Sequence, residues 1–437
     1  MSYQPIDHNI YYNVRFIKLD LMEFLSKSKG ANGIIKKFYE DFVVKEIIST
    51  GKTLEVGKAY KPEELDLKEN QDSKFTVFIL EKRNWDTIRA LLQVAKAFGR
   101  GKGAFSYAGT KDKFSVSTQL ASIHKVEPER LLSLNLKDIK INGAWRSDTI
   151  ELGSNVGNAF SVKIRDTNYD LANETVNELN GRFPNYFDKQ RFGYRLNNFK
   201  VGLHIIKNEL EEAVLSFLTD TKNEKDQESI EARKRLKENQ DYEDARNYFP
   251  KHLKYEKMVI DYLAKEKNYA NALRRVPRGI NIMFIHSVES AIFNFVLENY
   301  IKNEGIDEIK LKCMKNQFNF PDIEKLDVNG VFPVLPLIGY ETKNEYIGDI
   351  EKQVLEFLYI TNESFKIKSM PELSMKGSFR TAISPVNNVL LKEEGDCTVV
   401  DFSLQSGSYA TIFLNEITKS DSFKTQDVYE NFKTLRV

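Results

Sequence analysis

The stretch KFTVFILEKRNWDTIRALLQVAKAFGRGKGAFSYAGTKDK, residues 74–113, carries the clearest structural signal in the chain. Its first part, residues 74–82, is β-branched and aromatic, which predicts a strand. Over residues 84–98 apolar side chains recur at helical spacing, so an amphipathic helix follows. A second apolar run at 104–108 predicts another strand. This β-α-β unit leads the chain into a glycine-containing turn at 109–113.

Further strands are predicted on the C-terminal side of this unit. SVSTQLASI (115–123) and FSVKIRD (160–166) alternate between apolar and polar residues, as half-buried strands do. CTVVDFSL (397–404) and SYATIFLNEI (408–417) also have strand patterns. By contrast, residues 288–301 are apolar nearly all round, which predicts a buried helix.

Residues 221–246 are almost entirely charged and polar. Such a run has little apolar surface to bury, so we expect a solvated helix face or a mobile segment. Because this run lies within a longer helical stretch, the simplest organisation is one mixed α/β (α+β) domain interrupted by a mainly helical insertion.

Composition limits the classes of protein that remain. The 437 residues include 64 Lys+Arg against 63 Asp+Glu, a net charge of +1, and 41% are hydrophobic, which fits two or three globular domains. Cys313 and Cys397 form no CxxC or Cys/His pattern, which argues against a disulfide framework or a structural zinc site. The N-terminus has no signal-peptide pattern, and the apolar run 331–340 is too short to span a membrane. We expect a soluble, cytoplasmic protein.

Near-zero net charge argues against diffuse attraction to nucleic acid. It leaves room for a local basic surface, because a chain with many charges of both signs can separate them. We therefore expect basic residues in one cleft and acidic residues elsewhere, around 224–244.

The turn YAGTKDK (107–113) holds a carboxylate, Asp112, between Lys111 and Lys113. Taken alone, it is typical of a surface turn, since Asp and Gly are turn formers. It also fits a catalytic site, because flanking ammonium groups favour the ionised carboxylate and attract a phosphate backbone. Asp112 is then a candidate nucleophile or base.

A second segment, PNYFDKQRFG (184–193), alternates aromatic rings with amide and guanidinium groups. Holding an unstacked base requires such neighbours, although an aromatic corner of the core has the same composition. A third, KKFYEDFVVKEI (36–47), reads by itself as the start of a strand with ordinary exposed charge.

Taken together, these segments resemble the tRNA pseudouridine synthase D (TruD) family, and the length and Lys/Glu-rich composition are more similar to its archaeal members. Nine segments, covering about 35–416, carry the resemblance in the family's order. They are IKKFYEDFVVKEI, NWDT, SYAGTKDKFSVSTQ, GNAFSVKIRD, PNYFDKQRFG, SVESAIFNFVL, LPLIGYET, KGSFR and FSLQSGSYATIFLNE.

The resemblance implies a mixed, largely antiparallel pseudouridine synthase sheet flanked by helices, with a mainly helical insertion. We expect the catalytic domain at 1–195 plus 372–437 and the insertion at 196–371. The implied reaction converts uridine to pseudouridine, chiefly uridine 13 of tRNA. It needs no cofactor and no metal. The expected partner is tRNA, with no membrane, and we expect a monomer.

The resemblance also assigns roles to residues. Asp112 matches the catalytic aspartate; it adds to C1′, adds to the base, or removes a ribose proton. Lys36 matches a basic residue beside it that would keep it ionised. Phe187 is expected to stack on the target base, with Asn185 as a polar contact.

The RNA is expected to lie between the catalytic domain and the insertion. Residues of both parts are candidates for contact with it: Lys111, Lys113, Lys189, Gln190 and Arg191 on the catalytic side, and Arg274, Arg275 and Arg278 on the insertion.

Departures from the family pattern put details of RNA contact in doubt. Asp188 stands where Gly is usual, which restricts the backbone there. The other departures are Phe114 and Ser115 after the turn, Glu289 and Ala291, and Gln405 and Asn415.

Three alternative functions stay open: a pseudouridine synthase with other RNA substrates, a non-catalytic RNA-binding protein, and a glycoside hydrolase, which would need two carboxylates across a sugar.

Overall fold

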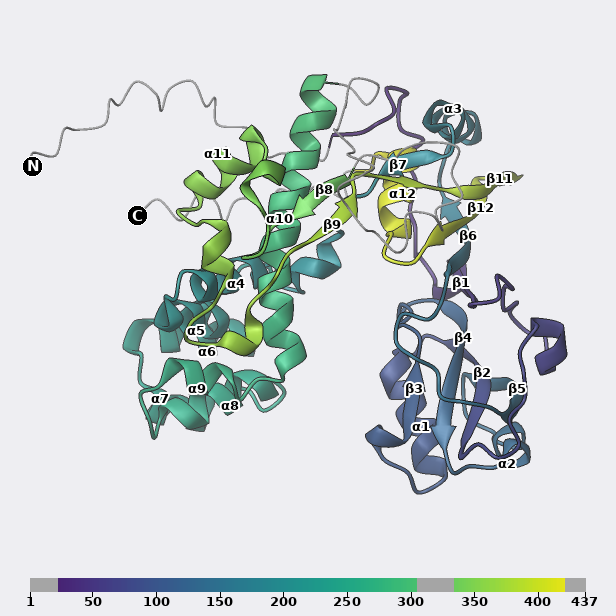
Figure 1. Cartoon of the computed structure of the whole chain (residues 1–437), viewed down its shortest axis with the longest axis horizontal. Helices are drawn as coiled ribbons and strands as arrows, with labels where there is room; N and C mark the ends of the chain where they lie inside the picture. Colours follow the sequence, from purple (N-terminus) through teal and green to yellow (C-terminus); the bar gives the residue numbers. More distant parts are fainter. Residues whose placement is uncertain (1–22, 305–333, 421–437) are drawn as a thin grey trace, which may run out of the picture.

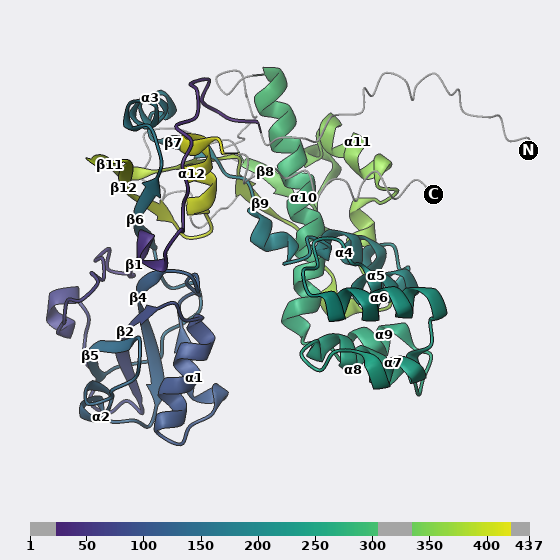
Figure 2. The ribbon, with the colours of Figure 1, turned by 180° about the vertical axis from the view of Figure 1, so that it is seen from behind.

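The structure is a computed structural model, and it describes residues 23–304 and 334–420. Two groups of elements, strands β2–β5 with helix α1 and helices α4–α9, lie on opposite sides of the molecule (Figures 1 and 2). They are joined through the strands β6 and β12, helix α12 and the long helix α10. Cys313 lies outside the described residues.

The main sheet has eight strands in the order β11-β12-β6-β1-β4-β2-β5, with β3 also paired to β4. Every pairing in it is antiparallel except β1 with β4. A mixed, largely antiparallel sheet is therefore confirmed. The strand bounds are β1 Phe42–Ile47, β2 Phe75–Arg83, β3 Phe105–Tyr107, β4 Val116–His124, β5 Ile139–Arg146, β6 Gly157–Arg165, β11 Asn387–Glu394 and β12 Cys397–Gln405. Two short pairs, β7 (Arg182–Pro184) with β10 (Ile383–Pro385) and β8 (Val334–Leu337) with β9 (Ser378–Thr381), stand apart from it.

The predicted β-α-β unit is confirmed as β2, α1 (Thr87–Ala97) and β3. Asp86 is the helix cap, because its carboxylate accepts a hydrogen bond from the backbone N–H of Arg89 at 3.0 Å. Gly99 follows the helix with φ of +66°. The helix buries Leu91, Val94 and their apolar neighbours against this part of the sheet.

The register of the parallel pair places two of the sequence motifs together. Val43, near the start of β1, pairs with Val116, the first residue of β4. Because parallel strands begin at the same edge, the segment before β1 and the turn before β4 come side by side. The first contains Lys36 and the second contains Asp112.

Helices form the other half of the molecule. They are α4 Asn198–Ile206, α5 Leu210–Thr219, α6 Gln227–Asn239, α7 Tyr242–Tyr248, α8 Lys254–Leu263, α9 Tyr269–Leu273, α10 Arg278–Glu304 and α11 Asp349–Phe357; α2 (Pro128–Leu132), α3 (Tyr169–Leu179) and α12 (Ala410–Thr418) belong with the sheet. The helix α10 is the buried helix expected at 288–301. Residues 278–302 are apolar and long enough to cross a membrane, but 72% of the most apolar window is buried in the protein, as in a core helix.

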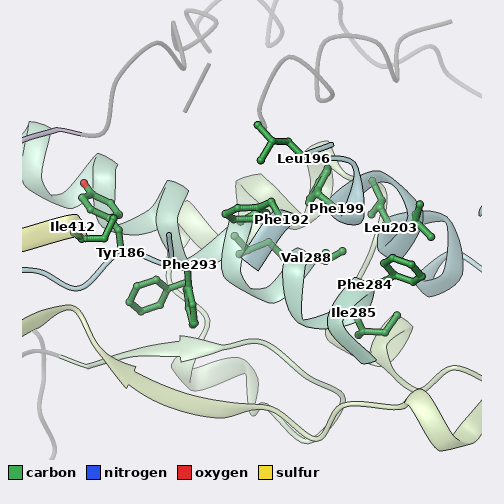
Figure 3. Close-up of a cluster of buried hydrophobic side chains, with 14 of the residues drawn as sticks. Tyr186, Phe192, Leu196, Phe199, Leu203, Phe284, Ile285, Val288, Phe293 and Ile412 are labelled. Carbon is green, nitrogen blue, oxygen red and sulfur yellow. The ribbon is translucent and has the colours of Figure 1, made fainter. Parts of the chain in front are cut away.

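One hydrophobic core runs from the sheet into the helices. The same cluster contains Val162 and Phe402 from the sheet and Phe199 and Phe293 from the helices. Figure 3 shows side chains of α4, α10 and the segment before α4 gathered in this core. The expected domain limits stay a prediction, since the two parts share their apolar interior.

The charged run at 221–246 forms α6, α7 and the loop before them. Its outer face is solvated, as expected, while Ala232 and Leu236 are buried. Arg233 is also buried, and its guanidinium pairs with Glu256 at 2.7 Å. At least one charged side chain of this run is therefore buried and paired inside the helical part of the protein.

The predicted strand at 408–417 is wrong, because residues Ala410–Thr418 form the helix α12. Its apolar residues recur at 410, 413, 414 and 417, a helical spacing. Ile412 is buried as well, so the helix is enclosed on several sides and its sequence also fits a strand. The neighbouring prediction for CTVVDFSL is confirmed by β12.

The crossing of α4 and α10 depends on Gly202. A Cβ atom there would lie 2.0 Å from the backbone oxygen of Phe284. This oxygen cannot rotate away as the end of a side chain can. We expect Gly202→Ala to lower the free energy of unfolding by about 1–3 kcal/mol through overpacking. Chemical denaturation measures this change. Gly279→Ala is the control, since nothing lies within 4 Å of its Cβ position. Equal stability of the two variants would contradict the prediction.

Candidate active site

An ion pair joins the two segments that the parallel strands bring together. The Lys36 Nζ lies 2.5 Å from the Asp112 Oδ2, and the two side chains are 21% and 31% exposed. The Lys36 ammonium also lies 4.1 Å from the centre of the Phe42 ring. Gln190 Nε2 donates to the other carboxylate oxygen of Asp112 at 3.4 Å. The carboxylate is thus held between two donors and remains open to solvent.

Buried side chains fix the turn that carries Asp112. Lys82 Nζ donates to the Asp112 backbone oxygen at 2.7 Å, and Ser115 Oγ donates to the same oxygen at 2.7 Å. The Gln119 amide donates to the Gly109 oxygen at 2.9 Å, and the Thr87 hydroxyl accepts from the Lys111 N–H at 2.9 Å. The polar backbone of the turn is therefore satisfied from the sheet and from α1.

Lys36 has an unusual backbone conformation, with φ of +57°. Such a left-handed conformation is uncommon outside glycine and persists where neighbouring contacts determine it. Here the Ile34 and Arg165 backbones exchange hydrogen bonds at 2.8 and 3.0 Å. Asp41 accepts the Phe38 N–H at 2.9 Å and two Arg165 donors at 2.7 and 2.8 Å. The Arg165 hydrogen bond is the main cause that lowers the pKa of Asp41.

A cavity of about 160 Å³ opens beside the ion pair. Its wall combines aromatic, small and polar side chains, including Phe42, Asp112, Phe160, Gln190, Tyr409 and Thr411. A cavity with aromatic and hydroxyl groups in its wall is suited to holding a planar, hydrogen-bonding ring next to the Asp112 carboxylate.

Phe187 lies behind this cavity rather than in its lining. It is 5% exposed, and its ring meets those of Phe293 and Tyr409 edge to face at 5.5 and 6.2 Å. Asn294 of α10 holds its backbone, accepting from the Phe187 N–H at 2.8 Å and donating to the Phe187 oxygen at 2.9 Å. Stacking of a base on Phe187 stays a prediction, and Tyr409 is the aromatic residue in the cavity wall.

Asn185 has a different environment from the one expected. Its side chain is buried, its Oδ1 accepts from Arg380 at 2.6 Å, and its Nδ2 donates to the Thr381 oxygen and hydroxyl. The amide is thus used within the protein. In this structure it supports the segment that carries Phe187.

Lys111 does not fit the expected phosphate contact. Its side chain is 4% exposed, and its Nζ lies 2.5 Å from the Glu46 carboxylate, which is also buried.

The other candidates on the catalytic side differ in exposure. Lys113 is exposed, and Gln190 is exposed beside Asp112. Arg191 lies over the Phe187 ring at 5.2 Å, and its Nε is buried without a hydrogen-bond partner among residues 23–304 and 334–420. Lys189 lies one residue before Gln190 in the same short helix, Lys189–Phe192.

The three arginines of the insertion are all exposed. Arg274 pairs with Glu372 at 2.7 Å, and Arg278 donates to the Glu372 backbone oxygen at 3.0 Å. Arg275 stacks over Tyr262 at 4.7 Å. Their contact with RNA stays a prediction, and Arg274 is already neutralised in part.

Two departures from the family pattern have a local explanation. Asp188 has φ of −76°, an ordinary backbone angle, so this position does not require glycine here. Its buried carboxylate accepts from the Lys189 N–H and the Thr411 hydroxyl, and burial raises its pKa. Phe114 is 41% exposed and packs edge to face on Tyr39 at 6.3 Å. A ring pair therefore lies beside the ion pair, between the same two segments.

Sequence reasoning missed several residues that build the site. Lys82 lies in the predicted strand 74–82, and Asn294 and Arg380 lie in the segments SVESAIFNFVL and KGSFR, but these patterns assign none of the three a role. Tyr409 lies in SYATIFLNEI, for which the sequence predicts a strand. Polar residues inside otherwise apolar segments were the available signal, because buried polar groups need partners.

Metal-binding residues do not cluster in the part of the chain that the structure describes. No group of three or more His, Cys, Asp and Glu residues is arranged there to hold an ion.

The buried Lys82 gives a prediction about pH. Burial lowers its pKa from 10.5 to about 8. Between these values the unfolded chain binds a proton that the folded protein does not, so stability rises with pH. We expect the wild type to gain about 3 kcal/mol relative to Lys82→Met across this window. Denaturation from about pH 7 to about pH 10 measures it, with Lys96→Met, at an exposed lysine of α1, as control. A constant difference would contradict the assignment.

Comparison with known proteins agrees with this architecture. The profile of the family described as tRNA pseudouridine synthase D (TruD) matches residues 18–417. A tRNA pseudouridine synthase D of Methanococcoides burtonii is 30% identical, with 93% of this chain and 97% of the relative covered. One of Methanopyrus kandleri is 35% identical over 79% of this chain and 86% of the relative. The crystal structure of the Methanosarcina mazei TruD protein has a TM-score of 0.69 at 26% identity and covers 92% of this chain and 97% of its own. The chain belongs to the tRNA pseudouridine synthase D family.

Proposed function

We propose that this protein converts uridine 13 of tRNA to pseudouridine, with Asp112 as the nucleophile. The observation that carries the proposal is the Lys36–Asp112 ion pair at the edge of the aromatic cavity. The Lys36 ammonium lies 2.5 Å from the carboxylate and fixes the position of the group that each route of the reaction uses.

The reaction exchanges one bond for another. The C1′–N1 bond breaks, the uracil turns within the site, and its C5 joins C1′. C5 loses its proton and N1 gains one, so the product is an isomer and no oxidant is needed. The Asp112 carboxylate takes part at C1′, at the base or at a ribose proton. An aromatic wall such as Tyr409 excludes water, which would otherwise capture the opened sugar.

The target base must leave its stack to reach Asp112. Extrusion costs a few kcal/mol, which phosphate contacts and stacking offset. The cavity beside Asp112 supplies the stacking groups, and exposed lysines such as Lys113 are suited to phosphate contact. We infer that the tRNA lies between the sheet and the helical insertion, whose exposed Arg275 would face it.

Substitution of Asp112 tests the proposal directly. We expect Asp112→Asn to lower the rate of pseudouridine formation by ~10³-fold or more while tRNA binding persists, since the amide cannot act as a nucleophile. Chemical labelling of pseudouridine with primer extension measures product and position. Asp170→Asn, at an exposed carboxylate in the first turn of α3, is the control.

Two outcomes would change the proposal. Full activity of Asp112→Asn would remove the nucleophile. Product at a position other than uridine 13 would leave the chemistry in place and replace the substrate assignment.

The two lysines that flank Asp112 should behave differently. Lys113→Gln is expected to weaken tRNA binding and to reduce the salt slope of the affinity by about 1, because one phosphate contact is lost. Lys111→Gln should instead lower the free energy of unfolding by about 3 kcal/mol, because Glu46 is left buried and unpaired. Filter binding over a salt series and chemical denaturation separate the two effects. Identical behaviour of both variants would contradict this assignment.

A further inference from the structure

Arg380 connects the segment that contains Phe187 to the segment that contains Tyr409. It lies in β9, and its Nε and Nη2 donate to the backbone oxygen and the Oδ1 of Asn185 at 3.0 and 2.6 Å. Its Nη1 donates to the Gly407 oxygen at 3.0 Å. Asn185 is two residues before Phe187, and Gly407 is two residues before Tyr409. One guanidinium therefore links both aromatic segments.

The same guanidinium lies against the aromatic rings. Its central carbon is 4.1 Å from the centre of the Phe187 ring, 5.6 Å from that of Phe293 and 5.9 Å from that of Tyr409. It does not line the cavity, whereas Tyr409 does. Arg380 thus acts on the cavity through the residues that it holds.

The charge of Arg380 has no carboxylate partner among the residues that the structure describes. Burial lowers its pKa to about 10, so it remains protonated at neutral pH. Arg191, on the same Phe187 ring, brings a second positive charge nearby. A buried cation bound only by neutral groups is costly to the fold, so Arg380 is a candidate for a role beyond stability.

We propose that Arg380 is a positioning residue for pseudouridine formation: its planar fork holds Phe187 and Tyr409 in the relative position that the target base requires. A lysine cannot replace it, because a single ammonium cannot make the paired bonds to Asn185, reach Gly407 and lie flat on Phe187 together. Asn294 fixes the Phe187 backbone from α10, so Arg380 supplies the link toward Tyr409.

The inference rests on the proposed chemistry at Asp112, and its test is a comparison of full-length variants. Arg380→Lys keeps the charge and loses the fork. We expect its single-turnover rate of pseudouridine formation on unmodified bulk tRNA to fall about 100-fold, while tRNA affinity stays within about threefold. In Arg380→Ala, added methylguanidinium should restore part of the rate.

Arg195→Lys is the matched control. Burial lowers the pKa of Arg195 to about 10 as well, and its guanidinium donates to the backbone oxygens of Asp220 and Phe217 at 2.6 and 2.9 Å. Unlike Arg380, it also has a carboxylate nearby, that of Glu256 at 3.9 Å, which accounts for its charge without a role at the cavity. It lies at the start of the helical part, away from the cavity lining. We expect this variant to lose stability and to keep its single-turnover rate.

Two results would overturn the proposal. One is an Arg380→Lys rate within about threefold of the wild type. The other is a loss of rate that follows a loss of thermal stability and tRNA affinity, as a general structural role would give. Because product is measured at any position, an error in the uridine 13 assignment leaves the test valid. If the wild type itself makes no pseudouridine, the proposed function fails before Arg380 is tested.

Discussion

The Lys36–Asp112 ion pair depends on a single parallel strand pairing in an otherwise antiparallel sheet. Because β1 and β4 start at the same edge, residues 76 positions apart in sequence reach 2.5 Å. Each partner is then held from behind: Lys82 and Ser115 bind the backbone of the Asp112 turn, and Arg165 with Asp41 fixes the strained loop of Lys36. The Asp112 carboxylate is thus oriented by the sheet and by the side chains that hold its turn.

Although the chain is nearly neutral, some of its cations are paired with carboxylates inside the protein and others are not. Around the cavity, Lys111 is neutralised internally by Glu46, while Arg191 and Arg380 share the Phe187 ring. In the helical part, Arg233 is neutralised by the buried Glu256, with Glu224 nearby. A net charge of +1 therefore says little about the charge that a substrate would meet. What matters is which cations already have a carboxylate partner.

The sequence was sufficient to predict local structure wherever one face of an element is buried. The helix α1 was confirmed because its periodicity reflects a single packing surface, and α10 was confirmed because a long stretch that is apolar nearly all round predicts a buried helix. The helix α12 was misassigned because it is enclosed on several sides. For the site, sequence identified Asp112 and Lys36 through their motifs. It could not show that Lys111 and Asn185 are used internally, since that depends on partners distant in the chain, Glu46 and Arg380.

The helical part of the molecule helps to build the candidate site. Phe187 follows the sheet in sequence, yet α10 holds its backbone through Asn294 and packs Phe293 on its ring. The same helix crosses α4 at Gly202, where two backbones touch closely. A shift of α10 at that crossing would pass directly to Phe187, because packed cores move as units rather than bend. Phe187, behind the cavity, is therefore positioned from two sides, by α10 through Asn294 and by β9 through Arg380, which also holds the segment of Tyr409 in the cavity wall.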